Sequence, residues 1–502
     1  MLASRALYSL LILLFVICLS PGNGVGYVSA NEPIPGEINP TPDPSLTSQA
    51  DAGEAIFLPL VQHPISVAKV SSNPKINAPY FDGDIVFQET AIFWFGKVNQ
   101  SENYTDVRIG HNADELFVHL AVFDRSVWYD KTPSPPTFTE WDSASLFLNL
   151  KGAPASSIGE NTYRFDGQLN GWEARDAYQA AYQGSSSNWI PVSVPFSTVT
   201  GWRGDSPNVD TKDDRGWRIT YRIPFTSLGL YGPPPEGANW GLAFSLSDRD
   251  DAEGTPIPEK RWPEEMNPNS PDSWGQLAFG LPDYSASQAT AAGSVIIRHG
   301  LNGATVMDGT VGGGTDCGST AVGTNFFTEW GEANYAGAHQ VNVQNQYDVS
   351  DWPCFSKIYF IFPLDSIPAG KTITAATLTV YQFSNAGGGE YGIPPGSLIQ
   401  VSKVNRNWDE ATLTWNNAPQ AWENIGSTWV DWIESPIPWP GAPRSWDVSL
   451  AVSEAYLAGE PLRLVLYSAD SAQHSGKYFI SSDTGDWNAS GRPSLEVTFG
   501  NP

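Results

Sequence analysis

The chain has 502 residues, of which 47 are Gly, 40 are Pro and only 16% are charged. Gly and Pro residues at this density interrupt long helices and favour short strands joined by turns. The formal net charge of −27 argues against nucleic acid and anionic membrane as partners, and leaves neutral ligands and divalent cations.

The first thirty residues predict a signal peptide over 1–30. Arg5 supplies a positive start, residues 10–19 form an unbroken apolar run, and Ala30 ends a Val-Ser-Ala site for signal peptidase. A membrane anchor is the alternative, but the run is short for a bilayer span. We therefore expect a secreted, extracellular protein with no transmembrane segment in the mature chain, and leave cell-surface association open.

Two stretches of low complexity divide the remainder. Residues 31–63 begin Pro- and Ser-rich without apolar periodicity and predict an extended tether. Residues 283–292 predict a linker between two domains, 64–282 and 293–502. Each piece is long enough for its own core, so we expect the two to fold independently.

The first piece has the alternation of an all-β domain. Strands are predicted at 107–109 and 116–123, on either side of a turn at Asn112–Glu115, and again at 145–150, 217–223 and 242–246. The order of "FDGD" (81–84), "TDVRIGHNADELFVHLAVFD" (105–124), "WDSASLFLNL" (141–150) and "DSWGQLAFG" (272–280) resembles the family 9 carbohydrate-binding modules. That resemblance implies a β-sandwich, often with structural calcium, that binds polysaccharide ends between two tryptophans.

The candidate sugar site departs from the family pattern. The family's first tryptophan stands three residues before the Asp-Ser, where this chain has Thr139, and Trp141 stands directly before Asp142. Trp262 and Trp274 are the candidates in the last loop, because indole rings stack on the apolar faces of sugars. Core packing is the alternative for each tryptophan. Arg164 is a candidate donor to sugar hydroxyls, with a surface ion pair as its alternative.

The turn "SDRDDAEG" is the best calcium candidate in the sequence. It offers Asp248, Asp250, Asp251 and Glu253 within one tight segment, and calcium binds several carboxylate oxygens from such loops. A solvated hairpin is the equally weighted alternative. We therefore predict structural Ca²⁺ at these four residues.

The second piece contains Gly370-Lys371-Thr372, which resembles the end of a phosphate-binding loop. The position five residues before Gly370 is Asp365 rather than glycine, and the alternation at 376–381 is that of a strand instead of a helix. We therefore predict a strand at this position. The stretches "FSKIYFIFPLDSIPAGKTITAATLTVYQF" (355–383) and "VNRNWDEATLTWNNAP" (404–419) resemble the DNRLRE domain. That resemblance implies a second, jelly-roll-like sandwich in which Gly370-Lys371 forms a β-turn between two strands, and some of its members bind polysaccharides.

Only two cysteines, Cys317 and Cys354, follow the predicted signal peptide. In an exported protein two cysteines in one domain predict a disulfide, which would stabilise the fold by about 3–4 kcal/mol through loop entropy. Two buried free thiols are the alternative.

No catalytic motif stands out. The chain lacks a Gly-x-Ser-x-Gly elbow and a His-Glu-x-x-His pair, so we nominate no catalytic residue. The favoured interpretation is a secreted, non-catalytic protein that binds polysaccharide or oligosaccharide. A structural surface or adhesion protein with two spacer sandwiches is one alternative. An accessory chain or enzyme of glycoside hydrolysis is the other, because that reaction needs only two carboxylates.

Overall fold

The computed structural model describes residues 73–502 except 153–154, 172–174, 212–213, 318–322, 348–353, 389–391 and 435–436. The predicted signal peptide and tether lie outside the described residues. Residues 69–502 form one compact unit. The described residues include no helix long and apolar enough to cross a membrane. The prediction of an all-β fold is confirmed, because the described chain is built from twenty-four strands and one α-helix with short 3-10 turns.

The first sandwich comprises strands β1 to β13. Its five-stranded antiparallel sheet runs in the order β2 (Ala91–Gly96), β3 (Tyr104–His111), β4 (Glu115–Phe123), β10 (Gly216–Pro224) and β9 (Ser197–Arg203). The predicted turn joins β3 to β4, where the Asn112 N–H donates to the Glu115 carbonyl over 3.2 Å. The Asn112 side-chain oxygen accepts the Asp114 N–H, which explains why an Asn serves at this turn.

The facing sheet of the first sandwich contains most of its remaining strands. They run in the order β1 (Lys75–Ala78), β13 (Gly275–Phe279), β11 (Asn239–Ser247), β5 (Ser143–Asn149), β6 (Thr162–Gln168), β7 (Gln179–Ser185) and β8 (Asn188–Val192), and β12 (Lys260–Trp262) pairs with β11. The alternation at 145–150, 217–223 and 242–246 thus identified β5, β10 and β11 correctly.

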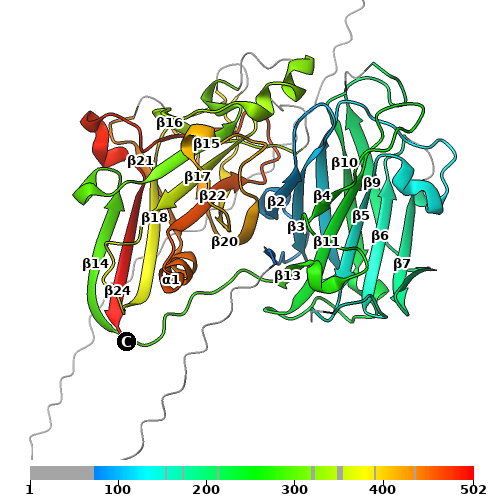
Figure 1. Ribbon diagram of the computed structural model, residues 1–502, viewed down its shortest axis with the longest axis horizontal. Coiled ribbons are helices and arrows are strands. Elements are labelled where there is room, and N and C mark those ends of the chain that lie inside the picture. Colours follow the sequence, from blue (N-terminus) through cyan, green and yellow to red (C-terminus); the bar gives the residue numbers. More distant parts are fainter. Residues whose placement is uncertain are drawn as a thin grey trace, which may run out of the picture. The chain divides into compact units, whose positions relative to one another are not determined.

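The second sandwich comprises strands β14 to β24 (Figure 1). One layer has the order β15 (Met307–Gly312), β17 (Ser356–Phe362), β22 (Leu462–Ser468), β19 (Ser397–Val404) and β20 (Ala421–Val430). The other has the order β14 (Thr290–Arg298), β24 (Ser494–Asn501), β18 (Thr372–Asn385), β23 (Lys477–Ile480) and β16 (Gln340–Val343), with β21 (Ala442–Asp447) paired to β18.

The Gly-Lys-Thr triplet forms the predicted turn and strand. Gly370 has φ +72°, a left-handed conformation that glycine adopts without a Cβ clash, and β18 begins at Thr372. The single α-helix of the described chain, α1 (Ser449–Ala458), was not predicted. Its Tyr456 hydroxyl donates to the Pro368 carbonyl and accepts the Lys371 N–H, so the helix fixes this turn.

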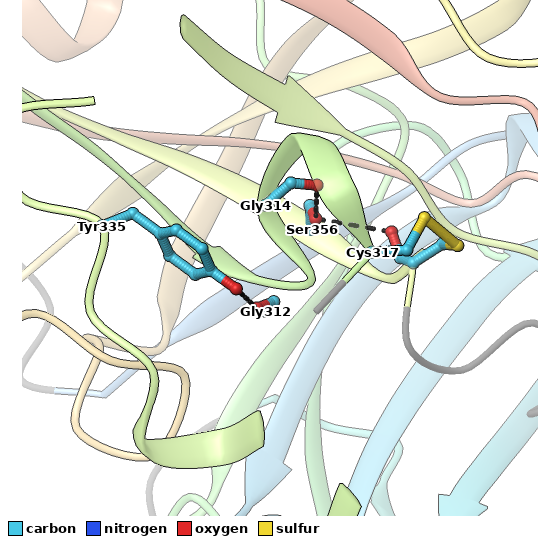
Figure 2. The surroundings of a disulfide bond; sticks show 6 residues. Gly312, Gly314, Cys317, Tyr335 and Ser356 are labelled. Atoms are coloured by element: carbon cyan, nitrogen blue, oxygen red, sulfur yellow. Dashed lines mark hydrogen bonds between the residues drawn. A yellow bond between two sulfur atoms is a disulfide. The ribbon is translucent and has the colours of Figure 1, made fainter. Parts of the chain in front are cut away.

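The disulfide between Cys317 and Cys354 is confirmed (Figure 2). It joins the end of a 3-10 turn that follows β15 to Cys354, two residues before β17 begins, with the two Cα atoms 4.1 Å apart. The Tyr335 hydroxyl donates to the Gly312 carbonyl over 2.8 Å beside it. The bond therefore closes a loop between two neighbouring strands of one sheet.

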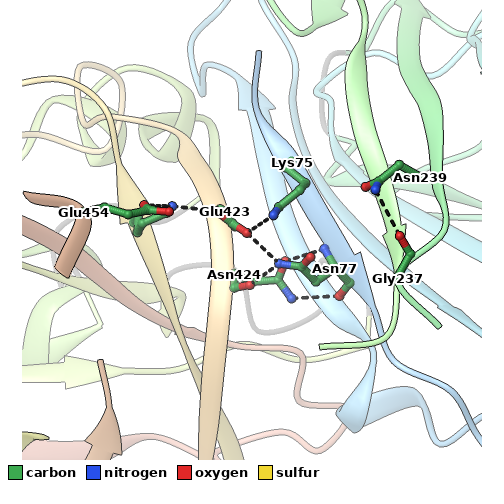
Figure 3. A network of polar contacts seen from close by, with 8 residues as sticks. Lys75, Asn77, Gly237, Asn239, Glu423, Asn424 and Glu454 are labelled. Atoms are coloured by element: carbon green, nitrogen blue, oxygen red, sulfur yellow. Dashed lines mark hydrogen bonds and ion pairs between the residues drawn. The ribbon is translucent and has the colours of Figure 1, made fainter. Parts of the chain in front are cut away.

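The two sandwiches share a continuous sheet. Strand β1 pairs in parallel with β13 of the first sandwich and, through Lys75 opposite Glu423, with β20 of the second. Asn77 and Asn424 exchange three hydrogen bonds of 2.6 to 2.9 Å, in which each side chain binds the other's backbone (Figure 3). A chain of ion pairs continues from Lys75 through Glu423 and Lys403 to Glu454.

A second set of buried contacts joins the sandwiches, and we call it the junction cluster: Trp94, Tyr104, Asp106, Asn345, Lys357, Trp415 and Tyr467. The Asp106 carboxylate accepts hydrogen bonds from Tyr104 (2.7 Å), Tyr467 (2.8 Å) and Asn345 (3.0 Å). The Lys357 ammonium donates to the Tyr104 hydroxyl over 2.6 Å and lies 3.6 Å from the centre of the Trp415 ring. Burial lowers the pKa of Lys357, and the charge of Asp106 opposes that shift.

Candidate functional site

Three aspartates meet at one end of the first sandwich, and we call them the acid triad: Asp124, Asp142 and Asp248. Asp124 directly follows β4, Asp142 directly precedes β5, and Asp248 directly follows β11. One carboxylate oxygen from each lies within 4.8 Å of the others. The pairing of Ser143 with Ser247 explains part of this geometry, because it brings the start of β5 beside the end of β11.

Burial and mutual repulsion shape the electrostatics of the acid triad. Asp124 and Asp142 are fully buried, and Asp248 is partly exposed. Burial raises the pKa of Asp124 and of Asp142 well above the ordinary value, and the neighbouring carboxylates reinforce both shifts. Burial, followed by the charge of Asp250, raises the pKa of Asp248 to about 7. Three carboxylates this close strongly favour a positive charge among them.

The residues of the acid triad fit a hard divalent cation. The Asp124 Oδ2 and Asp248 Oδ1 atoms are buried and have no hydrogen-bond partner within the described chain. Carboxylate oxygens are the ligands that Ca²⁺ binds in proteins. A cavity of about 460 Å³ reaches Asp248 and is lined by Glu140, Glu253 and Glu259, among other residues. An acidic cavity of this kind provides a path by which a cation can reach the triad.

The triad overlaps the predicted calcium ligands at only one residue, Asp248. Asp250 lies close enough for its charge to raise the pKa values of all three triad members. Hydrogen bonds from the Thr255 side chain and from its backbone N–H lower the Asp251 pKa. Glu253 lines the cavity beside the triad. The other two members, Asp124 and Asp142, come from distant segments of the sequence, outside the turn that suggested a calcium site.

Trp141 lies next to the acid triad. It is half-buried, and the Arg249 guanidinium carbon lies 4.0 Å from the centre of its ring. The Arg249 backbone N–H donates to the Asp142 carboxylate. Arg249 therefore contacts both the acid triad and Trp141. The guanidinium covers one face of the indole, which leaves at most one face for a sugar ring.

The other predicted sugar contacts are buried. Trp262 is 0% exposed and packs 4.5 Å from Phe93 between ring centres, and Trp274 is 1% exposed with its indole N–H on the Asn267 carbonyl. The alternative of core packing therefore describes both rings in this structure. Arg164 forms an ion pair with Asp166, with 2.6 Å between Nε and Oδ1. A surface ion pair was the alternative to sugar binding for Arg164, and the observed pair differs from it in being largely buried.

Exposed tryptophans occur in the second sandwich. Trp439 is 56% exposed and Trp487 is 68% exposed, with ring centres 4.8 Å apart and planes 89° apart. Phe383 of β18 lies behind Trp439 in a stacked arrangement at 6.4 Å, and Tyr478 of β23 lies 6.5 Å from Phe383. We call these four residues the aromatic corner. Two perpendicular indoles offer one sugar ring both a face and a side wall.

The sequence contains a local signal for the aromatic corner. Trp439 and Trp487 stand in "PIPWPGAP" and "DTGDWNAS", turn-forming segments outside any alternation. Tryptophans in such segments rarely have enough neighbours to be core. The resemblance to family 9 modules indicates tryptophans of the first sandwich instead, and most of these pack inward.

The second sandwich matches a family of carbohydrate-binding modules. Residues 328–498 match carbohydrate-binding module family 96, and this range includes all four residues of the aromatic corner. No protein with a curated description matches the chain. The match supports a carbohydrate-binding module in the second sandwich, whereas the finer DNRLRE resemblance stays a prediction.

Solved structures resemble the chain in part. A family 9 carbohydrate-binding module from Caldicellulosiruptor kristjanssonii, in complex with cellotriose, shares 17% identity. The similarity covers 42% of this chain and 95% of that one, with a TM-score of 0.30. A carbohydrate-binding protein described as putative, from Bacteroides uniformis, shares 13% identity over 41% of this chain and 100% of its own, with a TM-score of 0.32. TM-scores this low carry no argument about the ligand.

Proposed function

We propose that this protein is an exported, non-catalytic polysaccharide-binding protein and that the aromatic corner of its second sandwich holds the glycan. One observation carries the proposal: Trp439 and Trp487 expose more than half of their surface, at right angles, within the range that matches a carbohydrate-binding family. Exposed indoles lose contact with water when they cover the C–H face of a sugar, whose hydroxyls keep their polar partners at the rim.

Affinity electrophoresis tests this proposal. The protein is run through gels that contain soluble β-glucan, xylan, mannan or alginate, and retardation by at least one of these is expected. Trp439→Ala and Trp487→Ala should each clearly reduce the retardation. Tyr231→Ala is the matched control, because Tyr231 is a fully exposed aromatic residue of the first sandwich. Retardation equal to that of the parent in both tryptophan variants would contradict the assignment of the corner.

Trp141 remains a second candidate contact. Its partial exposure and its contact with Arg249, which lines a cavity of about 460 Å³, support a role in the first sandwich. Trp141→Ala in the same gels separates the two sites: loss of retardation with an intact aromatic corner would place the main site in the first sandwich. Retardation equal to that of the parent would indicate that Trp141 packs against Arg249 and does not bind the glycan.

We also propose that the acid triad holds a structural Ca²⁺. The support is the meeting of three carboxylates, of which two oxygens have no hydrogen-bond partner among the described residues. A bound cation would offset the repulsion among them and link β4, β5 and β11 at one end of the sandwich.

A further inference from the structure

A cleft lies where the two sandwiches meet. Its volume is about 320 Å³, at the lower end of the range for small-molecule sites. One wall is formed by residues that follow β1, chiefly Tyr80, together with Glu89 of the first sandwich. The opposite wall is formed by β19 and β20 of the second sandwich. Neither sandwich alone encloses the cleft.

The floor of the cleft is held by hydrogen bonds that cross the junction. The Gln400 amide donates to the Thr90 carbonyl over 2.6 Å and accepts the Ile92 N–H over 3.2 Å. The reciprocal bonds between Asn77 and Asn424 support the same floor. These side chains are therefore already satisfied, and the cleft exists before any ligand binds.

The walls of the cleft present aromatic side chains to solvent. Tyr80 is 51% exposed and Trp429 is 42% exposed. The strand register places Leu398 opposite Trp429 and Gln400 opposite Ser427, so all four residues share one face of the β19–β20 pair. Because Trp429 keeps this part of its surface exposed, its indole is available to a ligand.

The polar groups of the cleft disfavour an anionic ligand. Glu89 and Ser427 line it, and neither side chain has a hydrogen bond or ion pair to another described residue. No described lining residue is Lys or Arg. A carboxylate without a neighbouring cation repels anions and accepts hydrogen bonds from hydroxyl groups. Aromatic walls together with hydroxyl acceptors are the chemistry that recognises a neutral sugar.

We propose that this cleft is a second saccharide site, in which Tyr80 and Trp429 contact the sugar rings and Glu89 and Ser427 bind hydroxyls. The site takes a short stretch of a neutral glycan, because its volume is small. The ligand class rests on the proposed function, whereas the residues are separate from the aromatic corner. The two sandwiches would then act as one binder with a site at their junction.

Calorimetric titration of the full chain with cellotriose, xylotriose and mannotriose tests the proposal. The parent should bind one of these trisaccharides at two sites. Tyr80→Ala combined with Trp429→Ala should lower the stoichiometry from two to one and leave the site at the aromatic corner unchanged. Trp439→Ala combined with Trp487→Ala should remove the other site. Glu89→Gln should weaken the junction site about tenfold, as expected for the loss of one charge-assisted hydrogen bond.

The outcomes separate this proposal from the proposed function. One site in the parent that is lost only in the Trp439/Trp487 variant would overturn the junction site and leave the aromatic corner standing. Binding that is lost only in the Tyr80/Trp429 variant would support the junction site and overturn the corner. Binding of none of the three trisaccharides would overturn the junction site. Tyr231→Ala should retain both sites, and equal melting temperatures would exclude unfolding as the cause of a loss.

Discussion

The junction cluster and the aromatic corner are both built from tryptophan and tyrosine, yet their surroundings differ completely. At the junction, Trp94 and Trp415 are buried, and the Lys357 ammonium lies over both of their rings. At the corner, Trp439 and Trp487 contact mainly each other and water. The comparison shows that an aromatic surplus serves two purposes in this chain, because some rings hold the fold together and others remain open to a ligand.

Cutting the linker tests the junction most severely. A protease site placed between Ser285 and Ala289 allows cleavage without cutting a strand. The two halves should stay together as a single species in size-exclusion chromatography, because the sheet pairing and the buried ion contacts cross the junction. The expectation of independently folding domains predicts two separate folded species. That outcome would show that the junction is weak.

Loss of the Asp106 carboxylate, which accepts three hydrogen bonds in the junction cluster, should destabilise both sandwiches. Asp106→Ala leaves the Tyr104 and Tyr467 hydroxyls and Asn345 without their acceptor, next to a buried ammonium. Removal of one partner from a buried charged network costs about 3–5 kcal/mol of unfolding free energy. Urea denaturation measures the loss. Asp82→Ala, at an exposed acid of the same sandwich, should change stability by less than about 0.5 kcal/mol, and equal effects would contradict the role of the cluster.

The disulfide of the second sandwich should contribute a comparable amount to the unfolding free energy. It ties Cys354 to Cys317 just before β17, the strand that carries Lys357 to the junction. Cys354→Ser restores the entropy of a loop of 37 residues to the unfolded chain, which lowers stability by about 3–4 kcal/mol in the loop-entropy account. Denaturation of the parent with and without a reductant measures the same quantity, and no difference between them would contradict it.

Calcium should stabilise the first sandwich. At a concentration one hundred times its dissociation constant, Ca²⁺ would add about 2.7 kcal/mol to the unfolding free energy. Asp142→Asn should remove that gain, because Asp142 is a fully buried member of the acid triad. Asp251→Asn is the matched control, since its carboxylate is bound to Thr255. A gain that is lost in Asp251→Asn and kept in Asp142→Asn would place the ion in the loop.

The smallest effect on stability is expected at the aromatic corner. Trp439→Ala and Trp487→Ala remove side chains that are already more than half exposed, so each should change the unfolding free energy by less than about 0.5 kcal/mol. Trp262→Ala, in the core, should cost about 3–5 kcal/mol. Thermal melts of the three variants give the comparison. Similar losses at all three positions would show that the corner is part of the core.

The local patterns of the sequence determined the strands and their turns. Alternation identified β4, β5, β10, β11 and β18, and Asn112 and Gly370 identified two of the turns, because strand faces and turn conformations depend on a few neighbouring residues. The disulfide followed from the number of cysteines. The helix α1 was missed, since its ten residues are apolar on too many sides to show a helical stripe.

The tertiary structure alone decided which residues meet. The acid triad joins Asp124, Asp142 and Asp248 from three separate strand ends, and sequence proximity indicated only the last of them. The burial of Trp262 and Trp274 and the exposure of Trp439 and Trp487 depend on which sheet covers each ring. A residue type sets what a side chain can do, but long-range packing sets its neighbours and its access to water, and no local pattern contains that information.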